Sequence, residues 1–173
     1  ARLGTGLTCD ACDLTCEDLP KLCDAFYIGG TKNGLLFGEA LVIVNPVLQP
    51  FFRNMIKQNG GMLAKGRLLG VQFDALLKDD LWLKAARHAN EMANRLSQGI
   101  VDAGYRLFVT SPTNQVFAIL PIKVAQKLKE DFAFEFSGYW DDENEVYRFV
   151  TSWATPAEGV EALCRALEES HGG

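Results

Sequence analysis

The stretch Ile28-Gly29-Gly30-Thr31-Lys32-Asn33-Gly34 places a single lysine between glycines, and the rest of the chain is interpreted around it. One apolar run, Ala25-Phe26-Tyr27-Ile28, precedes the lysine, and a second, Ala40-Leu41-Val42-Ile43-Val44, follows it. The pattern predicts two strands joined by a glycine-rich turn, because glycine tolerates positive φ angles and lets the backbone approach a ligand closely. Two interpretations of Lys32 stay open here: a reactive amine on a rigid platform, or a solvated lysine at the tip of a hairpin.

Composition indicates a folded chain that can bury an apolar core. Of 173 residues, 48% are hydrophobic and 23% are charged, and the net charge is −5. The basic residues are scattered, which argues against nucleic acid or a membrane surface as the main partner. No apolar run approaches the roughly 20 residues that span a bilayer, and no signal-peptide pattern is present. We therefore expect a soluble, cytoplasmic protein.

The cysteines raise the question of a metal or redox site. Four of the five fall in one short segment. They are Cys9, Cys12, Cys16 and Cys23, with Cys164 remote. A Cys-x-x-Cys pair can bind a metal ion, but there is no second such pair, and both histidines lie far away in sequence. We expect no metal site and no disulfide framework, and the role of the four clustered cysteines stays open.

Hydrophobic periodicity predicts the elements of the first half. We expect the end of a strand at 2–8, a short helix opened by Thr15 to Asp18 and running to residue 22, and strands at 24–29 and 39–44. The last two are nearly continuous apolar runs, which favours strands covered on both faces by helices. Helices are expected at 50–57, 62–77 and 81–103. The last is the strongest, with Gly104 as its C-terminal cap, and His88, off its apolar stripe, is expected at the surface or an interface.

The second half predicts a compact α+β unit. Strands are expected at 106–109, 116–120, 133–136 and 147–151, with a helix at 121–130. Thr155-Pro156-Ala157-Glu158 has the composition of a helix start, so a last helix follows it. The chain is therefore an α/β protein in three parts: an α/β layer over 1–78, a linking helix over 79–104, and a small α+β domain over 105–173.

The sequences of several segments resemble those of one enzyme family. Ala1-Arg2, the lysine segment 26–34 and Gly38-Glu39-Ala40 are similar to the low-specificity L-threonine aldolase and β-eliminating lyase family. Lys65-Gly66-Arg67 and the segment from Arg148 to Trp153 extend the resemblance over the whole chain in the same order. These are pyridoxal 5'-phosphate (PLP) enzymes of the aspartate aminotransferase-like fold type I.

The resemblance implies that the chain is the C-terminal half of a longer enzyme. Residues 1–78 would then be the end of the large PLP-binding domain, and 105–173 the small C-terminal domain. The missing N-terminal half would supply the aspartate at the pyridinium nitrogen, the stacking histidine and the phosphate loop. The resemblance also implies a homodimer or homotetramer, and we expect the chain alone to be inactive.

The resemblance assigns site residues by number. Lys32 would form the Schiff base with PLP, so it is both catalytic and cofactor-binding. Arg2 and Arg148 would bind the substrate carboxylate, although a surface or inter-strand ion pair is the alternative for each. Thr31 would bind the cofactor phosphate.

Lys65 and Arg67 would reach the cofactor phosphate from a neighbouring subunit, and a solvated helix face is the alternative for both. The implied activity is cleavage of L-threonine, allo-threonine and related β-hydroxy-α-amino acids to glycine and an aldehyde. Two alternatives stay open: another PLP enzyme acting at Cα, such as a β-eliminating lyase, or an incomplete fragment that serves in folding or dimerisation.

Overall fold

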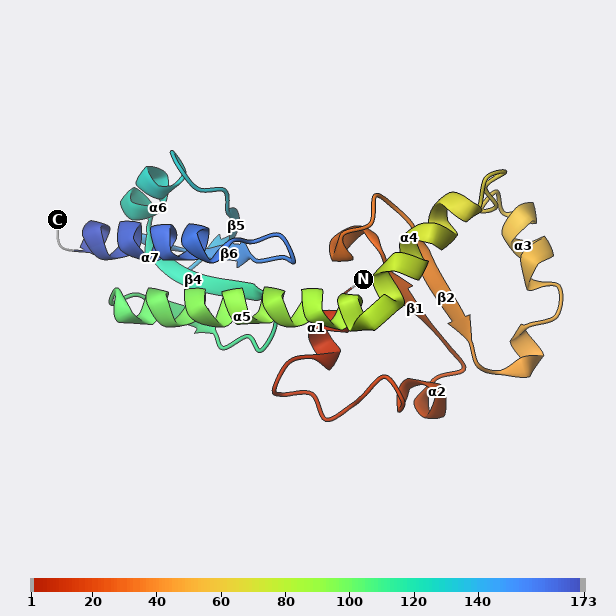
Figure 1. The fold of residues 1–173 in the computed structure, drawn as a ribbon. Coiled ribbons are helices and arrows are strands. Elements are labelled where there is room, and N and C mark those ends of the chain that lie inside the picture. The colour runs from red at the N-terminus through yellow and green to blue at the C-terminus, as the bar shows by residue number, and fades with distance from the viewer. Residues whose placement is uncertain (1, 172–173) are drawn as a thin grey trace.

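One long helix, α5 (Leu81–Asp102), joins the N-terminal and C-terminal groups of elements in this computed structural model, which describes residues 2–171 (Figure 1). Its buried residues repeat at helical spacing from Trp82 to Ile100, as the sequence predicts. The predicted cap is confirmed as well. Gly104 has φ +87°, and its N–H donates to the Val101 carbonyl at 2.9 Å.

The N-terminal group surrounds a two-stranded hairpin. In chain order its elements are α1 (Leu3–Leu7), α2 (Leu19–Leu22), β1 (Ala25–Gly29), η1 (Thr31–Asn33), β2 (Glu39–Ile43), η2 (Pro46–Leu48), α3 (Phe52–Gln58), α4 (Arg67–Leu77) and η3 (Lys78–Asp80). The two strands flanking the lysine turn are confirmed. Both helices α2 and α4 begin later than predicted. Asp18 accepts hydrogen bonds from Thr15 N–H (2.9 Å) and Thr15 Oγ1 (2.6 Å), which closes a turn ahead of α2.

The expectation that helices cover both faces of β1 and β2 is wrong for the described part of the chain. The strands pair antiparallel, with Ile28 opposite Ala40. One face packs on a core cluster of Ile28, Phe73, Leu76 and Trp82, whereas Tyr27 and Leu41 on the other face are about half exposed, at 50% and 48%. An antiparallel pair can leave one face uncovered, and the apolar runs alone did not distinguish this arrangement from a doubly covered one.

The strand end expected at 2–8 is also wrong, because this segment forms helix α1. Thr8 N–H donates to the Gly4 carbonyl at 3.1 Å, and the Thr8 hydroxyl donates to the same carbonyl at 2.8 Å. Gly4 lies against α5: a Cβ at this position would be 2.8 Å from Trp82 Nε1 and 3.2 Å from Ala86 Cβ. Two glycines weaken helix propensity, so tertiary packing on α5 decides the conformation.

The C-terminal group is a four-stranded antiparallel sheet against which two helices of the same group pack. Its elements are β3 (Arg106–Val109), β4 (Gln115–Pro121), α6 (Ile122–Leu128), β5 (Glu135–Tyr139), β6 (Asn144–Val150) and α7 (Ala157–His171), with strand order β3-β4-β6-β5. The predicted order of elements is confirmed, with β5 beginning two residues later and β6 three residues earlier than expected.

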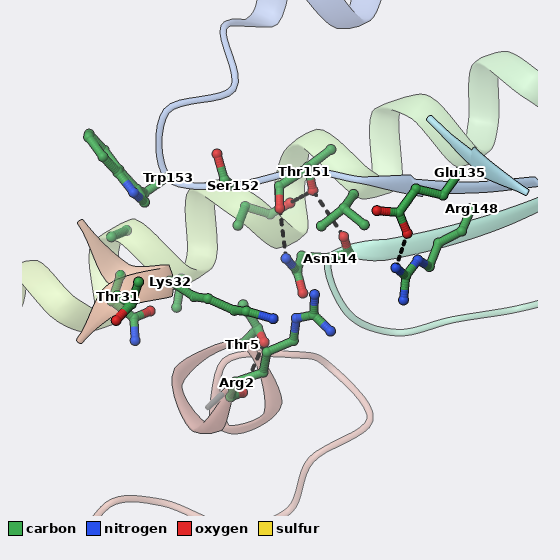
Figure 2. A pocket seen from close by; sticks show the side chains of 15 residues that line it. Arg2, Thr5, Thr31, Lys32, Asn114, Glu135, Arg148, Thr151, Ser152 and Trp153 are labelled. Carbon is green, nitrogen blue, oxygen red and sulfur yellow. Dashed lines mark hydrogen bonds and ion pairs between the residues drawn. The ribbon is translucent and has the colours of Figure 1, made fainter. Parts of the chain in front are cut away.

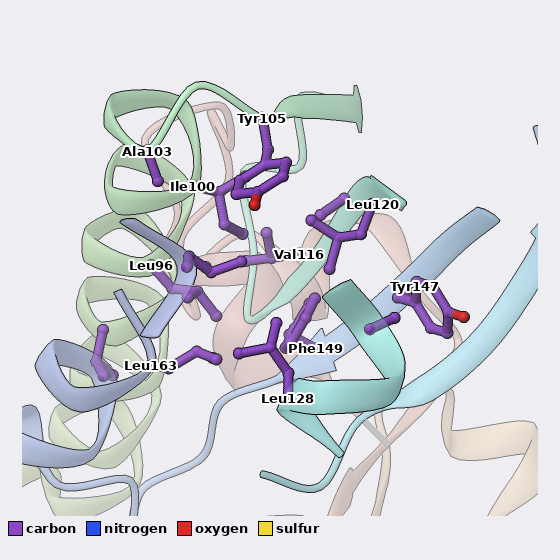
Figure 3. Packing of buried hydrophobic residues seen from close by; sticks show 14 of the residues in the cluster. Leu96, Ile100, Ala103, Tyr105, Val116, Leu120, Leu128, Tyr147, Phe149 and Leu163 are labelled. Atoms are coloured by element: carbon purple, nitrogen blue, oxygen red, sulfur yellow. The ribbon is translucent and has the colours of Figure 1, made fainter. Parts of the chain in front are cut away.

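The main core lies between this sheet and helices α5, α6 and α7 (Figure 3). Ile100, Leu120 and Leu167 are completely buried there. This packing holds the sheet that carries Arg148 against α5. No helix in the described residues has the length and apolar character needed to cross a membrane.

Candidate functional site

The lysine turn is held by hydrogen bonds that depend on its glycines. Gly30 N–H donates to the Gly38 carbonyl at 2.9 Å, and the Asn33 side chain donates to the Gly29 carbonyl. A Cβ on Gly30 would lie 2.8 Å from that Gly38 oxygen, so only glycine fits there. Gly34 ends the turn at φ +99°, a left-handed conformation that glycine adopts without strain. The turn is therefore a fixed platform for Lys32.

Lys32 opens on a cavity of about 390 Å³ that is lined from several distant segments (Figure 2). Lining residues come from α1 and the residue before it, the lysine turn, α5, the turn before β4, β5, β6 and the segment after β6. They are Arg2, Thr5, Thr31, Lys32, Asn33, Ala85, Ala86, Ala89, Asn114, Glu135, Arg148, Val150, Thr151, Ser152 and Trp153. Four of the six predicted site residues thus line one cavity.

The Lys32 amine is available to a ligand. Its side chain is exposed and extends toward Asn114 and the guanidinium of Arg2 (Figure 2). Within residues 2–171 it has no hydrogen-bond or ion-pair partner. Thr31, the adjacent residue on the turn, lines the same cavity. The lysine is therefore more than a solvated hairpin tip, since its turn forms one wall of the cavity.

The two arginines reach the cavity from opposite halves of the chain. Arg2 precedes α1, and its Nε is buried without a hydrogen-bond partner among the described residues. Arg148 on β6 forms an ion pair with Glu135, its cross-strand neighbour on β5, and lies 3.3 Å from Gln115 Oε1. The inter-strand ion pair considered as an alternative for Arg148 is therefore present, and the same guanidinium also lines the cavity.

The structure does not bring Lys65 and Arg67 to this cavity. Arg67 lines a separate hollow together with Arg53 and Lys57. Lys65 is exposed in the turn before α4. Within this chain both side chains lie on a solvated surface.

Sequence reasoning missed the residues that brace the cavity. Asn114 is buried, and its side chain donates to the Thr151 carbonyl at 2.7 Å. The Thr151 hydroxyl donates to the Ala89 carbonyl on α5 at 2.6 Å. Trp153 packs beside the lysine turn: a Cβ on Gly34 would lie 3.4 Å from its ring. The only signal in the sequence was that the motif from Arg148 continues through Trp153.

His88 and the cysteines lie outside the cavity lining. His88, expected at the surface or an interface, has a half-buried side chain whose Nε2 donates to the Thr155 carbonyl at 2.8 Å. All five cysteines are free thiols. No cluster of three or more histidine, cysteine or acidic side chains in the described part of the chain is arranged to hold a metal ion.

Comparison with known proteins gives the family. No protein-family model matches the chain. The low specificity L-threonine aldolase of Pseudomonas aeruginosa is 34% identical over 145 residues, a match that covers 83% of this chain and 41% of that protein. A solved structure of Leishmania major threonine aldolase superposes with a TM-score of 0.94 and 40% identity, covering 99% of this chain and 50% of that one. The chain matches the threonine aldolase family over part of that family's length.

The predicted resemblance to the threonine aldolase family, over part of that family's length, and the predicted fold type I are therefore confirmed. A solved structure of SPT with PLP superposes at a TM-score of 0.57 with 11% identity, which supports the fold alone. The chain spans between two-fifths and half the length of the threonine aldolases it matches.

Proposed function

We propose that this chain is the C-terminal half of a PLP-dependent threonine aldolase and that Lys32 holds the cofactor covalently. One observation carries the proposal: Lys32, Arg2 and Arg148 are far apart in sequence, yet all three line one cavity. A volume of about 390 Å³ lies in the range of small-molecule sites. A lysine and two arginines around such a space fit an aldehyde cofactor and a carboxylate substrate.

The residues present fit PLP by their chemistry. An unpaired primary amine can condense with the cofactor aldehyde, and lysine is the residue that proteins use for this. Thr31, on the same turn, offers a hydroxyl to the cofactor phosphate. When bound, the cofactor withdraws electrons from the bonds to the substrate Cα. The rigid η1 turn keeps the amine on one wall of the cavity, so the cofactor is held in one place.

Arg2 and Arg148 orient the substrate. A guanidinium binds a carboxylate through two parallel hydrogen bonds, and two such groups together fix which bond at Cα is aligned for cleavage. The bond is Cα–Cβ of a β-hydroxy-α-amino acid such as L-threonine or allo-threonine, and the products are glycine and an aldehyde. Arg2 Nε, buried and unpaired within the described residues, has a hydrogen bond to offer to such an anion.

Groups outside this chain complete the site. A base must take the β-hydroxyl proton, and we assign it to the missing N-terminal half because His88 already donates to the Thr155 carbonyl. Lys65 and Arg67 belong to the phosphate site of a neighbouring subunit in a homodimer or homotetramer, which agrees with their distance from the cavity of their own chain. The chain alone is then inactive, and the enzyme acts in the cytoplasm.

We also propose the domain division 1–78, 79–104 and 105–173. Two separate apolar clusters support it. One gathers on the β1–β2 hairpin and α4, and the other lies between the four-stranded sheet and helices α6 and α7. Helix α5 contributes to both and serves as the linking helix.

The test uses the full-length protein. After incubation with PLP and reduction with borohydride, mass spectrometry should find the pyridoxyl group on the peptide that contains Lys32. Lys32→Ala should abolish this label and the formation of glycine from L-threonine and L-allo-threonine. Lys123→Ala, an exposed lysine with no role proposed here, is the matched control and should change neither. Labelling at another lysine would refute the assignment, whereas labelling with release of a 2-oxo acid and ammonia in place of glycine would make the protein a β-eliminating lyase.

A further inference from the structure

Two consecutive residues of α5 are the attachment points for both arginine-bearing segments. The Ala89 carbonyl accepts the hydroxyl of Thr151 at 2.6 Å. The Asn90 side chain donates to the Thr5 carbonyl at 2.9 Å. Thr151 lies three residues after Arg148, and Thr5 lies three residues after Arg2. One turn of α5 therefore serves as a common reference for the two guanidinium groups.

On the Arg2 side the attachment is made by a buried asparagine. Asn90 is 5% exposed and lies beside the apolar stripe of α5. Besides Thr5, its Nδ2 donates to Thr8 Oγ1 at 3.2 Å, and the Thr5 hydroxyl donates to the Arg2 carbonyl at 2.9 Å. A polar group is costly to bury unless it is hydrogen-bonded. The Nδ2 group is therefore satisfied by α1, which it ties to α5 at two points, whereas Asn90 Oδ1 is buried without a hydrogen-bond partner among the described residues.

On the Arg148 side the attachment is a buried threonine. Thr151 is 3% exposed. Beyond its hydroxyl bond to α5, its N–H donates to the Asn114 carbonyl at 3.1 Å and its carbonyl accepts from Asn114 Nδ2 at 2.7 Å. These bonds fix the end of β6 to α5 and to the start of β4. The position of Arg148 along β6 is thereby set relative to Ala89.

We propose that Asn90 and Thr151 are positioning residues that set the distance and relative orientation of Arg2 and Arg148, and so the affinity for the substrate carboxylate. The proposal rests on the role of the two arginines given under Proposed function. Asn90 is not among the lining residues of the cavity, and Thr151, which is, directs its hydroxyl to the Ala89 carbonyl. Bidentate recognition of a carboxylate tolerates little displacement of a guanidinium, so loosening either attachment weakens carboxylate binding while Lys32, on its own turn, keeps its place.

Thr151 allows a closely matched pair of variants in the full-length holoenzyme. Thr151→Val keeps the shape of the side chain and removes the hydroxyl, and Thr151→Ser keeps the hydroxyl. We expect Thr151→Val to raise the KM for L-threonine about tenfold with a much smaller change in kcat, as for the weakening of one charge-assisted hydrogen bond. Thr151→Ser should restore the KM. The amount of PLP bound at Lys32 should not change in either variant.

A second hydroxyl provides the control for a purely structural effect. Ser170 donates to the Ala166 carbonyl on α7 at 2.7 Å, far from the cavity. Ser170→Ala removes a similar bond and should leave the KM unchanged. If Thr151→Val folds and lowers thermal stability while its KM stays at the wild-type value, Thr151 is merely structural and the proposal is wrong. Should Thr151→Val fail to fold, Asn90→Leu tests the Arg2 side with the same readouts.

Glycine binding separates this proposal from the proposed function. Glycine carries the same carboxylate, and calorimetry measures its dissociation constant without any turnover. If the wild type makes no glycine from threonine yet binds glycine about tenfold more tightly than Thr151→Val or Asn90→Leu does, the aldolase function fails and the positioning role stands. If wild type and variants bind glycine equally, or the wild type does not bind it, the positioning role is refuted.

Discussion

Gly34 gives the sharpest prediction about the lysine turn. It has φ +99° and ψ −2° at the end of η1. An L-residue in a left-handed conformation costs about 1–2 kcal/mol relative to glycine. The new Cβ of Gly34→Ala would lie 3.4 Å from the Trp153 ring, an ordinary van der Waals contact, so the cost comes from the backbone conformation. We expect the free energy of unfolding to fall by about 1–2 kcal/mol, and the Lys32 amine to shift with the turn.

Gly60 supplies the matched control. It also has a positive φ, +74°, in the turn after α3, but a Cβ there has nothing within 4 Å. Gly60→Ala should carry a backbone penalty of similar size, with no effect on the cavity. The two variants therefore separate the loss of stability, which both should show, from the loss of cofactor binding, which only Gly34→Ala should show.

Two measurements on the full-length protein decide the outcome. Thermal unfolding reports the stability of each variant. Titration with PLP, followed by borohydride reduction and quantification of the Lys32 peptide, gives the apparent affinity for the cofactor. Equal cofactor affinity in wild type, Gly34→Ala and Gly60→Ala would refute the idea that this turn positions the amine. Wild-type stability of Gly34→Ala would refute the backbone argument.

Three further predictions concern the ion pair of Arg148, the hydrogen bond of Tyr147 and the main apolar core. Glu135→Gln removes the carboxylate that pairs with Arg148. Because an exposed ion pair is worth at most about 1 kcal/mol, the KM for threonine should fall by up to about fivefold, and a rise in KM would show that Glu135 assists Arg148 instead of competing with the substrate. Burial and the hydrogen bond to Glu145 raise the pKa of Tyr147 to about 12. Only the unfolded phenol then ionises as the pH rises from about 10 to 12, so stability falls over that interval. Tyr147→Phe should flatten this alkaline decline in thermal midpoint, and an unchanged pH profile would contradict the assignment. Ile100 is fully buried, and Ile100→Ala should cost about 2–5 kcal/mol of unfolding free energy in urea titrations. A cost below about 1 kcal/mol would mean that the core collapses into the void that the truncated side chain leaves.

Elements with strong local signals were predictable from the sequence. The strands on both sides of Lys32, the apolar stripe of α5 and its cap at Gly104 each depend on residues close together in the chain, and all are confirmed. The segment at 2–8 was mispredicted because its helix depends on contacts with Trp82 and Asn90, more than 70 residues away. Local propensity, lowered by Gly4 and Gly6, points the other way.

The candidate site was predictable only where a motif names its residues. Lys32, Arg2 and Arg148 were predicted from sequence motifs, and they line the same cavity. The roles of Asn90, Thr151 and Asn114 were not predicted, because each acts through a hydrogen bond to a residue between 37 and 85 positions away. The one hint in the sequence was that the segment resembling the family continues from Arg148 through Thr151 to Trp153.

Helix α5 has a further consequence for how the molecule unfolds. Trp82, near its first turn, belongs to the hairpin cluster, and Met92 to Ile100 belong to the cluster under the four-stranded sheet. A helix of 22 residues is about 33 Å long, and its hydrogen bonds are continuous between the two cores. Fraying from either end soon removes side chains from a core. Helix α5 therefore couples the unfolding of the two cores, so that unfolding of the hairpin lowers the barrier to unfolding of the sheet.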